Sequence, residues 1–182
     1  MKKILVLLAH SSFAESKVNK AIIERISKLE NVKVHDLYKE YPDFKINVKK
    51  EQELLINSDL IIFQFPFNWY SCPAILKEWQ DKVLLYGFAY GSGGNALHGK
   101  DFLVSISTGG DQNSYQKGGS NNFTINELLK PIEQTAKLCG MNYLPYFTIH
   151  GVPNFPKVPL TDLQTKALNI HIEKLEAFLI NS

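Results

Sequence analysis

Five short apolar runs recur along the chain, and segments with a helical pattern separate them. The runs span Ile4–Ala9, Val32–Leu37, Asp59–Phe65, Phe102–Ser107 and Tyr143–His150. The first, third and fourth are so uniformly apolar that both of their faces must be covered, which is typical of strands inside a parallel sheet. We therefore expect five parallel strands.

The segments between these runs repeat apolar residues with the period of an α-helix. One apolar face runs from Val18 to Leu29 and another from Ile75 to Val83. Further helices are expected near Val48–Asn57, Thr124–Cys139 and Asp162–Ile180, and Thr161 with Gln164 fits a capping box before the last. The alternation predicts an α/β fold, an open five-stranded parallel sheet with helices on both faces. Such sheets bind ligands at the carboxyl ends of their strands.

Composition narrows the classes of protein. A chain of 182 residues with 45% hydrophobic content can build one core, so we expect a single domain over residues 1–182. The net charge of +2 comes from charges spread along the chain, and no nucleic-acid partner is expected. Ile4–Ala9 is followed by no cleavage site, and no apolar segment approaches the roughly 18 residues that cross a bilayer. Cys72 and Cys139 form no CxxC motif, which fits unpaired thiols in a reducing cytoplasm.

An aromatic loop follows the third expected strand. The stretch QFPFNWYSCP, from Gln64 to Pro73, carries four aromatic rings and two prolines. It either plugs the end of the core or forms a stacking wall for a flat ligand, with Asn68 and backbone N–H groups as polar contacts. The pattern leaves both interpretations open.

Small polar residues follow the first and fourth strands. Between His10 and Asn19, the loop can hold an anion at the start of a helix, or its serines can merely cap that helix. It contains no glycine, so it is no GxGxxG turn. Thr108-Gly109-Gly110 either exposes backbone N–H groups to a ligand or forms a tight turn. Tyr115, just beyond, is either a general acid or another core ring.

Other chemistries find little support. Gly94–Lys100 matches the GxxxxGK part of a P-loop, but Asp101 replaces the required Ser or Thr and the segment enters a strand. The five histidines show no HxH or HxxxH spacing, so we expect most of them to be ordinary polar residues and no metal site. No GxSxG elbow indicates a hydrolase.

Several motifs taken together resemble the flavodoxin-like NAD(P)H:quinone oxidoreductases. These motifs are QFPFNWYSCPAILKEWQDKVL, GFAYGSGG, ALHGK, SISTGG and the CGM after the fourth expected helix. The chain is most similar to the bacterial branch with the ancillary subunits of the glutathione-regulated potassium-efflux system and the general stress oxidoreductases. LYKEYPDFKINVKKEQELL is similar to that branch in particular, and the resemblance covers nearly the whole chain.

This resemblance implies a flavin site built by the three loops. The phosphate and ribityl part would be held by His10, Ser16, Lys17, Val18 and Asn19. The isoalloxazine edge would lie along Phe67, Asn68, Trp69 and Tyr70, and Thr108, Gly109, Gly110 and Asp111 would close the other side. Backbone N–H groups facing the ring would stabilise its reduced form. The short first loop favours FMN over FAD.

The resemblance also implies a two-electron, ping-pong mechanism. NAD(P)H passes a hydride to the flavin and leaves, and a quinone then takes its place. Tyr115 would hydrogen-bond the quinone oxygen. Animal relatives carry a catalytic histidine six positions later, where this chain has Asn121, an amide that cannot act as an acid.

Assembly and partners follow from the same similarity. The segment Phe88–Gly91 implies a homodimer in which Tyr90 reaches the neighbouring subunit's flavin and contacts substrate, and the alternative is an aromatic hairpin packed on its own domain. The branch implies a second role as a regulatory ancillary subunit of a membrane potassium-efflux transporter. The chain would then be cytoplasmic, with no direct membrane insertion, and would reach the inner face of the cell membrane only through its protein partner.

Overall fold

The computed structural model describes residues 1–152 and 158–182, and its centre is a parallel sheet. The strands are β1 (Ile4–Leu8), β2 (Val32–Asp36), β3 (Leu60–Pro66), β4 (Asp101–Ser107), β5 (Asn142–Tyr143) and β6 (Phe147–Ile149). They follow the order β2-β1-β3-β4-β5, and β6 also pairs with β4. The predicted open parallel sheet is confirmed, with five strand positions and a sixth short strand.

The fifth strand position is divided between β5 and β6. Both pair with β4 in parallel, with Phe102 opposite Tyr143 and Ser107 opposite Ile149. The prediction of one continuous strand over Tyr143–His150 is wrong, because Pro145 between the two strands has no N–H group to continue the ladder. The pairing nevertheless carries β6 to the carboxyl end of β4.

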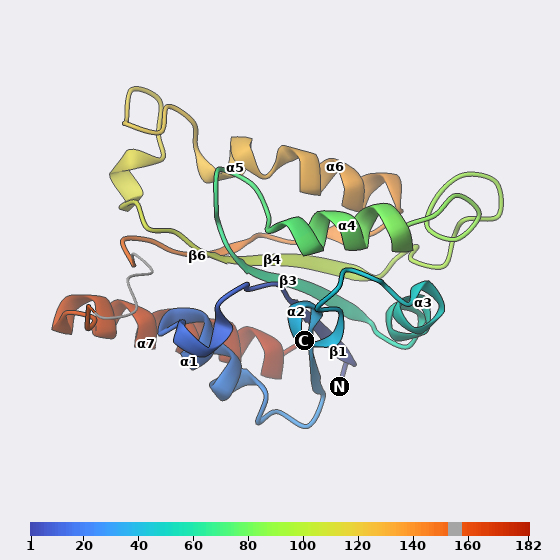
Figure 1. Cartoon of the computed structure of the whole chain (residues 1–182), viewed down its shortest axis with the longest axis horizontal. Helices are drawn as coiled ribbons and strands as arrows, with labels where there is room; N and C mark the ends of the chain where they lie inside the picture. The colour runs from blue at the N-terminus through green and yellow to red at the C-terminus, as the bar shows by residue number, and fades with distance from the viewer. Residues whose placement is uncertain (153–157) are drawn as a thin grey trace.

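Helices cover both faces of the sheet. They are α1 (Val18–Ile26), α2 (Leu37–Glu40), α3 (Val48–Ile56), α4 (Ala74–Val83), α5 (Ile125–Leu128), α6 (Lys130–Leu138) and α7 (Asp162–Ile180), with 3-10 turns η1 (Phe13–Glu15) and η2 (Gln112–Ser114). Figure 1 shows α4 and α6 on one side of the sheet and α1 and α7 on the other. This arrangement confirms the predicted layers.

Two details of the helices differ from the sequence prediction. The single helix expected over Thr124–Cys139 is two helices, because Pro131 in the first turn of α6 cannot donate an N–H group to a carbonyl of α5. The short α2 was not expected, and Asp36 caps it by accepting the Lys39 N–H at 3.2 Å. The capping box of Thr161 and Gln164 is confirmed at the start of α7.

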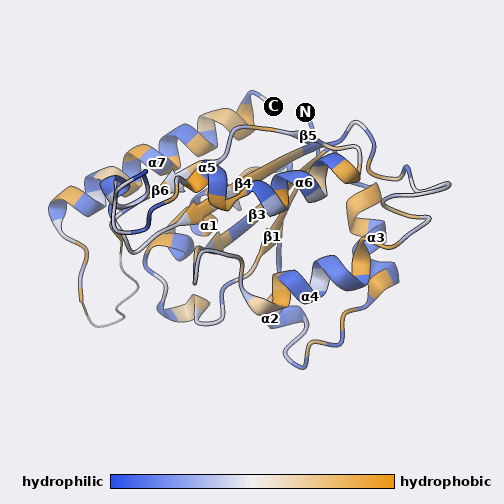
Figure 2. Cartoon of the chain, turned by 90° about the horizontal axis from the view of Figure 1, so that it is seen from above, coloured by the Kyte–Doolittle hydropathy of each residue, from blue (hydrophilic) through white to orange (hydrophobic). Residues whose placement is uncertain are grey.

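The strands place alternate side chains in two apolar cores. In β1, Leu5 and Leu7 belong to the core under α3, α4 and α6, whereas Val6 and Leu8 belong to the core under α1 and α7. A strand sends successive side chains to opposite faces, so a strand buried on both sides must be apolar throughout. Figure 2 shows this as hydrophobic strands between helices that carry both colours.

The loops that leave the carboxyl ends of the strands meet at one edge of the sheet. The segments after β4 and β6 lie at the same end of the molecule in Figure 1. None of the helices in the described part of the chain has the length and apolar character needed to cross a membrane.

Candidate functional site

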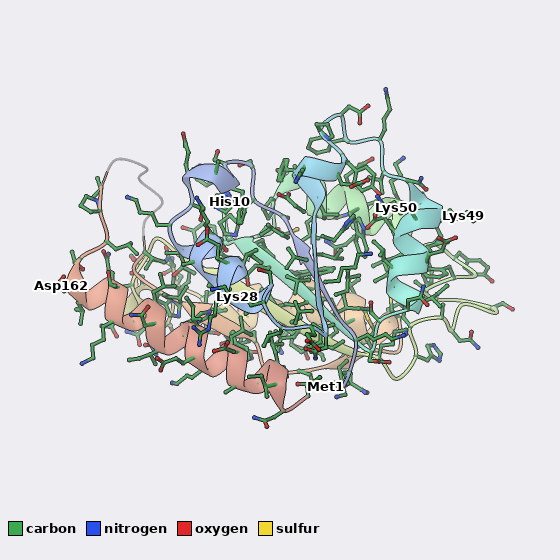
Figure 3. All side chains as sticks on the ribbon, turned by 90° about the horizontal axis from the view of Figure 1, so that it is seen from below. Met1, His10, Lys28, Lys49, Lys50 and Asp162 are labelled. Atoms are coloured by element: carbon green, nitrogen blue, oxygen red, sulfur yellow. The ribbon has the colours of Figure 1, made fainter. Side chains whose placement is uncertain are left out.

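His10 follows the first strand, and its side chain is buried. It follows β1 and lies at the other end of that strand from Met1 (Figure 3). Its Nδ1 accepts the Ser12 N–H at 3.2 Å, which leaves the proton of the neutral ring on Nε2. Burial lowers the pKa of His10 by more than the charge of Asp36 raises it. Nε2 is buried and has no hydrogen-bond partner among the described residues, so a donor is available to an acceptor that the chain does not provide.

Asn19 ties the first loop to the centre of the sheet. It is buried in the first turn of α1, where its N–H donates to Ser16 Oγ at 3.2 Å. Its side chain donates to Ser107 Oγ at 3.0 Å and accepts from Gln64 Nε2 at 2.8 Å. The loop is therefore fixed to β3 and β4 from beneath, which holds its backbone N–H groups in place.

Lys17 and Val18 occupy the start of the same helix. Val18 is buried in the core under α1, and the Lys17 ammonium donates to the Val158 carbonyl. A hollow of about 530 Å³ lies nearby at the carboxyl ends of β1 and β2. It is lined by Leu8, Phe13, Ile23, Val34, His35, Asp36, Lys39 and Glu40.

The aromatic loop after β3 is a tight turn that displays its rings. Ser71 N–H donates to the Asn68 carbonyl at 3.1 Å, and between them Trp69 and Tyr70 both have positive φ, at 50° and 61°. Trp69 is 93% exposed and Asn68 is exposed, whereas Phe67 is buried in the core. Phe67 therefore plugs the core as the first interpretation expects, whereas the stacking wall for a flat ligand stays a prediction.

The glycine loop after β4 lies beside Tyr115. Thr108 is buried, and its hydroxyl donates to the Gly110 carbonyl at 2.8 Å. Gly109 is exposed, and Asp111 begins η2 by accepting the Ser114 N–H at 2.9 Å. A Cβ atom on Gly110 would lie only 3.2 Å from a ring carbon of Tyr115, so glycine allows this close approach.

A pocket of about 260 Å³ joins the second and third loops. It is lined by Phe67, Trp69, Tyr70, Gly110, Ser114, Tyr115, Ser120 and Asn121. The Tyr115 ring lies 6.5 Å from that of Phe67, and the Tyr70 hydroxyl donates to Asn121 Oδ1 at 3.1 Å. Burial raises the pKa of Tyr115, so its phenol stays protonated at neutral pH and can donate a hydrogen bond. The pocket thus combines ring faces for stacking with hydroxyl donors, among them that of Tyr115.

His150 lies beside Tyr115 and Thr108, although the spacing of the histidines predicts an ordinary polar residue there. It directly follows β6, its Nδ1 lies 3.0 Å from Thr108 Oγ1, and its ring lies 5.6 Å from that of Tyr115. Burial lowers the pKa of His150, and the charge of Asp111 opposes this in part. Its position at the carboxyl end of an expected strand was the signal that could have identified it.

Tyr90 is not brought to this edge. It lies between α4 and β4, and this segment projects at the opposite end of the sheet from the loop after β4 (Figure 1). Its half-buried ring packs edge-on against Tyr86 at 5.8 Å. A Cβ atom on Gly94 would meet the Tyr90 carbonyl oxygen at 2.0 Å, so this hairpin requires glycine there. Across the described residues, no group of three or more His, Cys, Asp or Glu is placed to hold a metal ion.

Comparison with known proteins gives the family. The profile of the flavodoxin-like fold family matches residues 2–171. The chain belongs to this family. General stress protein 14 of Bacillus subtilis (strain 168) is 55% identical over 150 residues, which cover 82% of this chain and 86% of that protein. The glutathione-regulated potassium-efflux system ancillary protein KefF of Salmonella schwarzengrund (strain CVM19633) is 46% identical over 147 residues, which cover 81% and 82%.

Solved structures of flavodoxin-like proteins superpose along most of the chain. General stress protein 14 from Treponema denticola, in complex with FMN, gives a TM-score of 0.85 at 35% identity and covers 96% of this chain and 98% of that one. An NADPH-quinone reductase from P. pentosaceus gives 0.80 at 35% identity, covering 94% and 96%. The predicted resemblance to this oxidoreductase branch is confirmed.

Proposed function

We propose that this flavodoxin-like chain is an NAD(P)H:quinone oxidoreductase that uses FMN. The observation that carries the proposal is the buried Nε2–H of His10 near the carboxyl end of β1, which has no partner in the part of the chain that the structure describes. A phosphate oxygen would satisfy this donor, and the following helix α1 begins close by at Val18 with the positive end of its dipole. The similarity to an FMN-bound general stress protein and to an NADPH-quinone reductase supports the same conclusion.

In this proposal each of the three loops contacts a different part of the flavin. His10, Ser16, Lys17, Val18 and Asn19 hold its phosphate and ribityl part. Phe67, Asn68, Trp69 and Tyr70 lie along one edge of the ring, and Thr108, Gly109, Gly110 and Asp111 lie on the other side. Asn19 supports the first loop and does not bond the flavin through its amide, because both ends of that amide are already bonded to the sheet. Bound FMN supplies the two-electron hydride chemistry that no side chain offers.

The chain's own contribution is to orient the substrate and to supply a proton. Burial keeps the Tyr115 phenol protonated, so it can donate to a quinone oxygen. Phe67 closes the floor of the pocket, and Gly110 lets a flat ring approach the backbone. In a ping-pong cycle the nicotinamide and the quinone use this one pocket in turn.

Reconstitution tests the proposal directly. The purified chain is mixed with FMN or FAD, affinity is measured by fluorescence quenching, and NAD(P)H oxidation is followed with and without a benzoquinone. We expect a yellow protein that prefers FMN and turns over faster with quinone. His10→Ala should weaken FMN binding by about 1.5–3 kcal/mol, the value of a hydrogen bond to a charged group. His98→Ala, at an exposed histidine, is the matched control. A colourless protein without quinone-stimulated turnover would contradict the proposal.

We further propose that the chain works as one domain and assembles as a homodimer. Tyr90 lies in the segment between α4 and β4, which projects at the opposite end of the sheet from the loop after β4 (Figure 1), so in this proposal it contacts substrate in a second subunit. Trp69 and Tyr86 are 93% and 66% exposed, and an interface between subunits would cover such rings.

A regulatory role is the second candidate function, and the similarity to KefF is the observation that favours it. We propose that the chain, in that case, is a cytoplasmic ancillary subunit that docks on a potassium-efflux transporter at the inner face of the membrane. Co-purification with a transporter tests the docking. Restoration of efflux control by a variant without turnover, such as Tyr115→Phe, would separate this role from catalysis.

A further inference from the structure

The Thr108 hydroxyl determines how the proton of His150 is placed. That hydroxyl has one hydrogen, which it donates to the Gly110 carbonyl at 2.8 Å. At its 3.0 Å contact with His150 Nδ1 it must therefore accept, and Nδ1 must carry the proton. Nε2 of His150 then carries the lone pair and can only accept, which is the opposite tautomer from His10. The assignment follows from the hydrogen-bond pattern.

Backbone hydrogen bonds hold His150 in this position. Beyond the paired strands, Thr108 N–H donates to the Ile149 carbonyl at 2.9 Å, and Val152 N–H donates to the Thr108 carbonyl at 3.0 Å. Gly151 N–H donates at 2.8 Å to the Gly110 carbonyl that also receives the Thr108 hydroxyl. Backbone hydrogen bonds therefore join the ends of β4 and β6 and place the backbone of His150 beside Thr108.

Tyr115 completes the group. Burial raises the pKa of its phenol and the nearby Tyr70 raises it further, whereas a hydrogen bond with the Thr108 side chain lowers it. Asp111 is the charged group that acts on His150. Asn121, by contrast, carries no charge, and its Oδ1 accepts from the Tyr70 hydroxyl.

We propose that His150 is a positioning residue which, through the Thr108 hydroxyl, orients the Tyr115 phenol and stabilises the charge left when it gives up its proton. This inference rests on the proposed function. In quinone reduction, a hydride that originates from NAD(P)H brings two electrons and one proton, and the Tyr115 O–H bond breaks to supply the second proton. The product is the neutral hydroquinone, and the Tyr115 oxygen regains a proton from water. His150 Nδ1–H polarises Thr108, whose hydroxyl turns from Gly110 toward the phenolate.

Three variants separate these contacts. His150→Leu removes the donor, Thr108→Val removes the hydroxyl while keeping the side-chain shape, and His150→Asn is the matched control because its amide N–H lies near the place of Nδ1–H. Nitrogen NMR of the purified flavoprotein reports the His150 tautomer. Ionisation of tyrosine labelled at Cζ reports the Tyr115 pKa, and the Tyr115→Phe variant assigns that signal among the 8 tyrosines.

We expect the Nδ1–H tautomer and a higher Tyr115 pKa in both His150→Leu and Thr108→Val. The double variant should add nothing further, and His150→Asn should leave the Tyr115 pKa near its original value. In His150→Leu, kcat/KM for a benzoquinone should fall about tenfold, as for loss of a hydrogen bond that supports a developing charge.

An unchanged Tyr115 pKa in both His150→Leu and Thr108→Val would overturn the inference, as would the Nε2–H tautomer. Failure of the proposed function looks different. If the protein shows no quinone turnover but His150→Leu still raises the Tyr115 pKa, the positioning holds and the proposed activity is refuted.

Discussion

Trp69 and Tyr70 are neighbours that both adopt positive φ, at 50° and 61°, in the centre of one turn. Side chains other than glycine, asparagine and aspartate rarely adopt this conformation, and each strained residue costs about 1–3 kcal/mol. The turn that joins Asn68 to Ser71 has the φ signs of a type I′ turn, for which Asn-Gly is the preferred pair. This strain occurs where the turn displays two rings beside the pocket, and we propose that the display serves the flavin site.

Replacing the strained pair should stabilise the protein and impair its site. We expect the double variant Trp69→Asn/Tyr70→Gly to raise the free energy of unfolding by about 1–3 kcal/mol, because both residues fit positive φ. FMN affinity should fall at the same time, since the stacking surface is gone. Urea denaturation and flavin titration measure the two effects. Tyr70→Phe, which keeps the strain and the ring, should give neither change, and a less stable double variant would show that the turn is not strained.

Trp79 belongs to a buried network that the sequence pattern did not indicate. Its indole N–H donates to Glu51 Oε2 at 2.8 Å, and the other carboxylate oxygen lies 2.8 Å from His35 Nε2 and accepts the Tyr41 hydroxyl at 2.5 Å. Burial raises the pKa of Glu51, but these hydrogen bonds outweigh it, and the pKa lies below its ordinary value. The network connects β2, α3 and α4.

The two tryptophans of the chain offer a matched test of this network. Trp79→Phe should lower the free energy of unfolding by about 1–3 kcal/mol at pH 7, because a buried carboxylate loses a donor. The loss should shrink in acid, because a carboxyl with a lowered pKa stabilises the fold when ionised and this contribution disappears as the pH falls through that pKa. Trp69→Phe, the same change at a side chain 93% exposed, should leave stability unchanged. Equal effects of the two substitutions would contradict the role of Glu51.

The regular part of the fold could be predicted because its physics is local. Strands buried on both faces must be apolar throughout, and that signal is strong in β1, β3 and β4. The breaks were harder to predict, because Pro145 and Pro131 interrupt hydrogen bonding inside runs that otherwise keep their apolar pattern. The four-residue α2 depends on one cap, Asp36, and has too few residues for a periodic signal.

The candidate site also has a part that the sequence could predict and a part that it could not. The rule that ligands bind at the carboxyl ends of parallel strands located the loops with His10, Trp69 and Thr108. His150 was not predicted as a site residue, because its contact with Thr108 depends on the register between β4 and β6, in which Ser107 pairs with Ile149. No spacing between residues 108 and 150 encodes that register. The positive φ of Trp69 could not be predicted either, because a tryptophan rarely adopts it.

His171 gives the protein a defined response to acid. It is buried in α7 with Nε2 unpartnered among the described residues, and burial lowers its pKa from 6.5 to about 4. The unfolded chain therefore binds a proton near pH 6.5 that the folded chain accepts only near pH 4. Stability should fall as the pH drops across that window, by an amount on the order of 3 kcal/mol.

Substitution of His171 should remove this pH dependence. We expect His171→Leu and His171→Gln to differ in stability at pH 7, because one is apolar and the other carries a buried amide. Both should show a flatter loss of stability between pH 6.5 and 4, because neither titrates there. Chemical denaturation at a series of pH values gives the slopes. If both variants keep the slope of the original protein, His171 is not its source.

The shared site makes a prediction about mixed dimers. The segment that carries Tyr90 lies at the opposite end of the sheet from the loop after β4 (Figure 1), so in the proposed dimer a Tyr90→Ala subunit impairs the partner's site and a Tyr115→Phe subunit impairs its own. A mixed dimer then has one doubly altered site and one intact site.

Random reassortment of equal amounts of the two variants should restore about a quarter of all sites, because half of the dimers are mixed and each has one good site of two. Light scattering first establishes the dimer, and Tyr90→Ala alone should raise the quinone KM without changing FMN affinity. Mixtures no more active than the average of the two variants, or a fully active monomer, would show that each chain completes its own site.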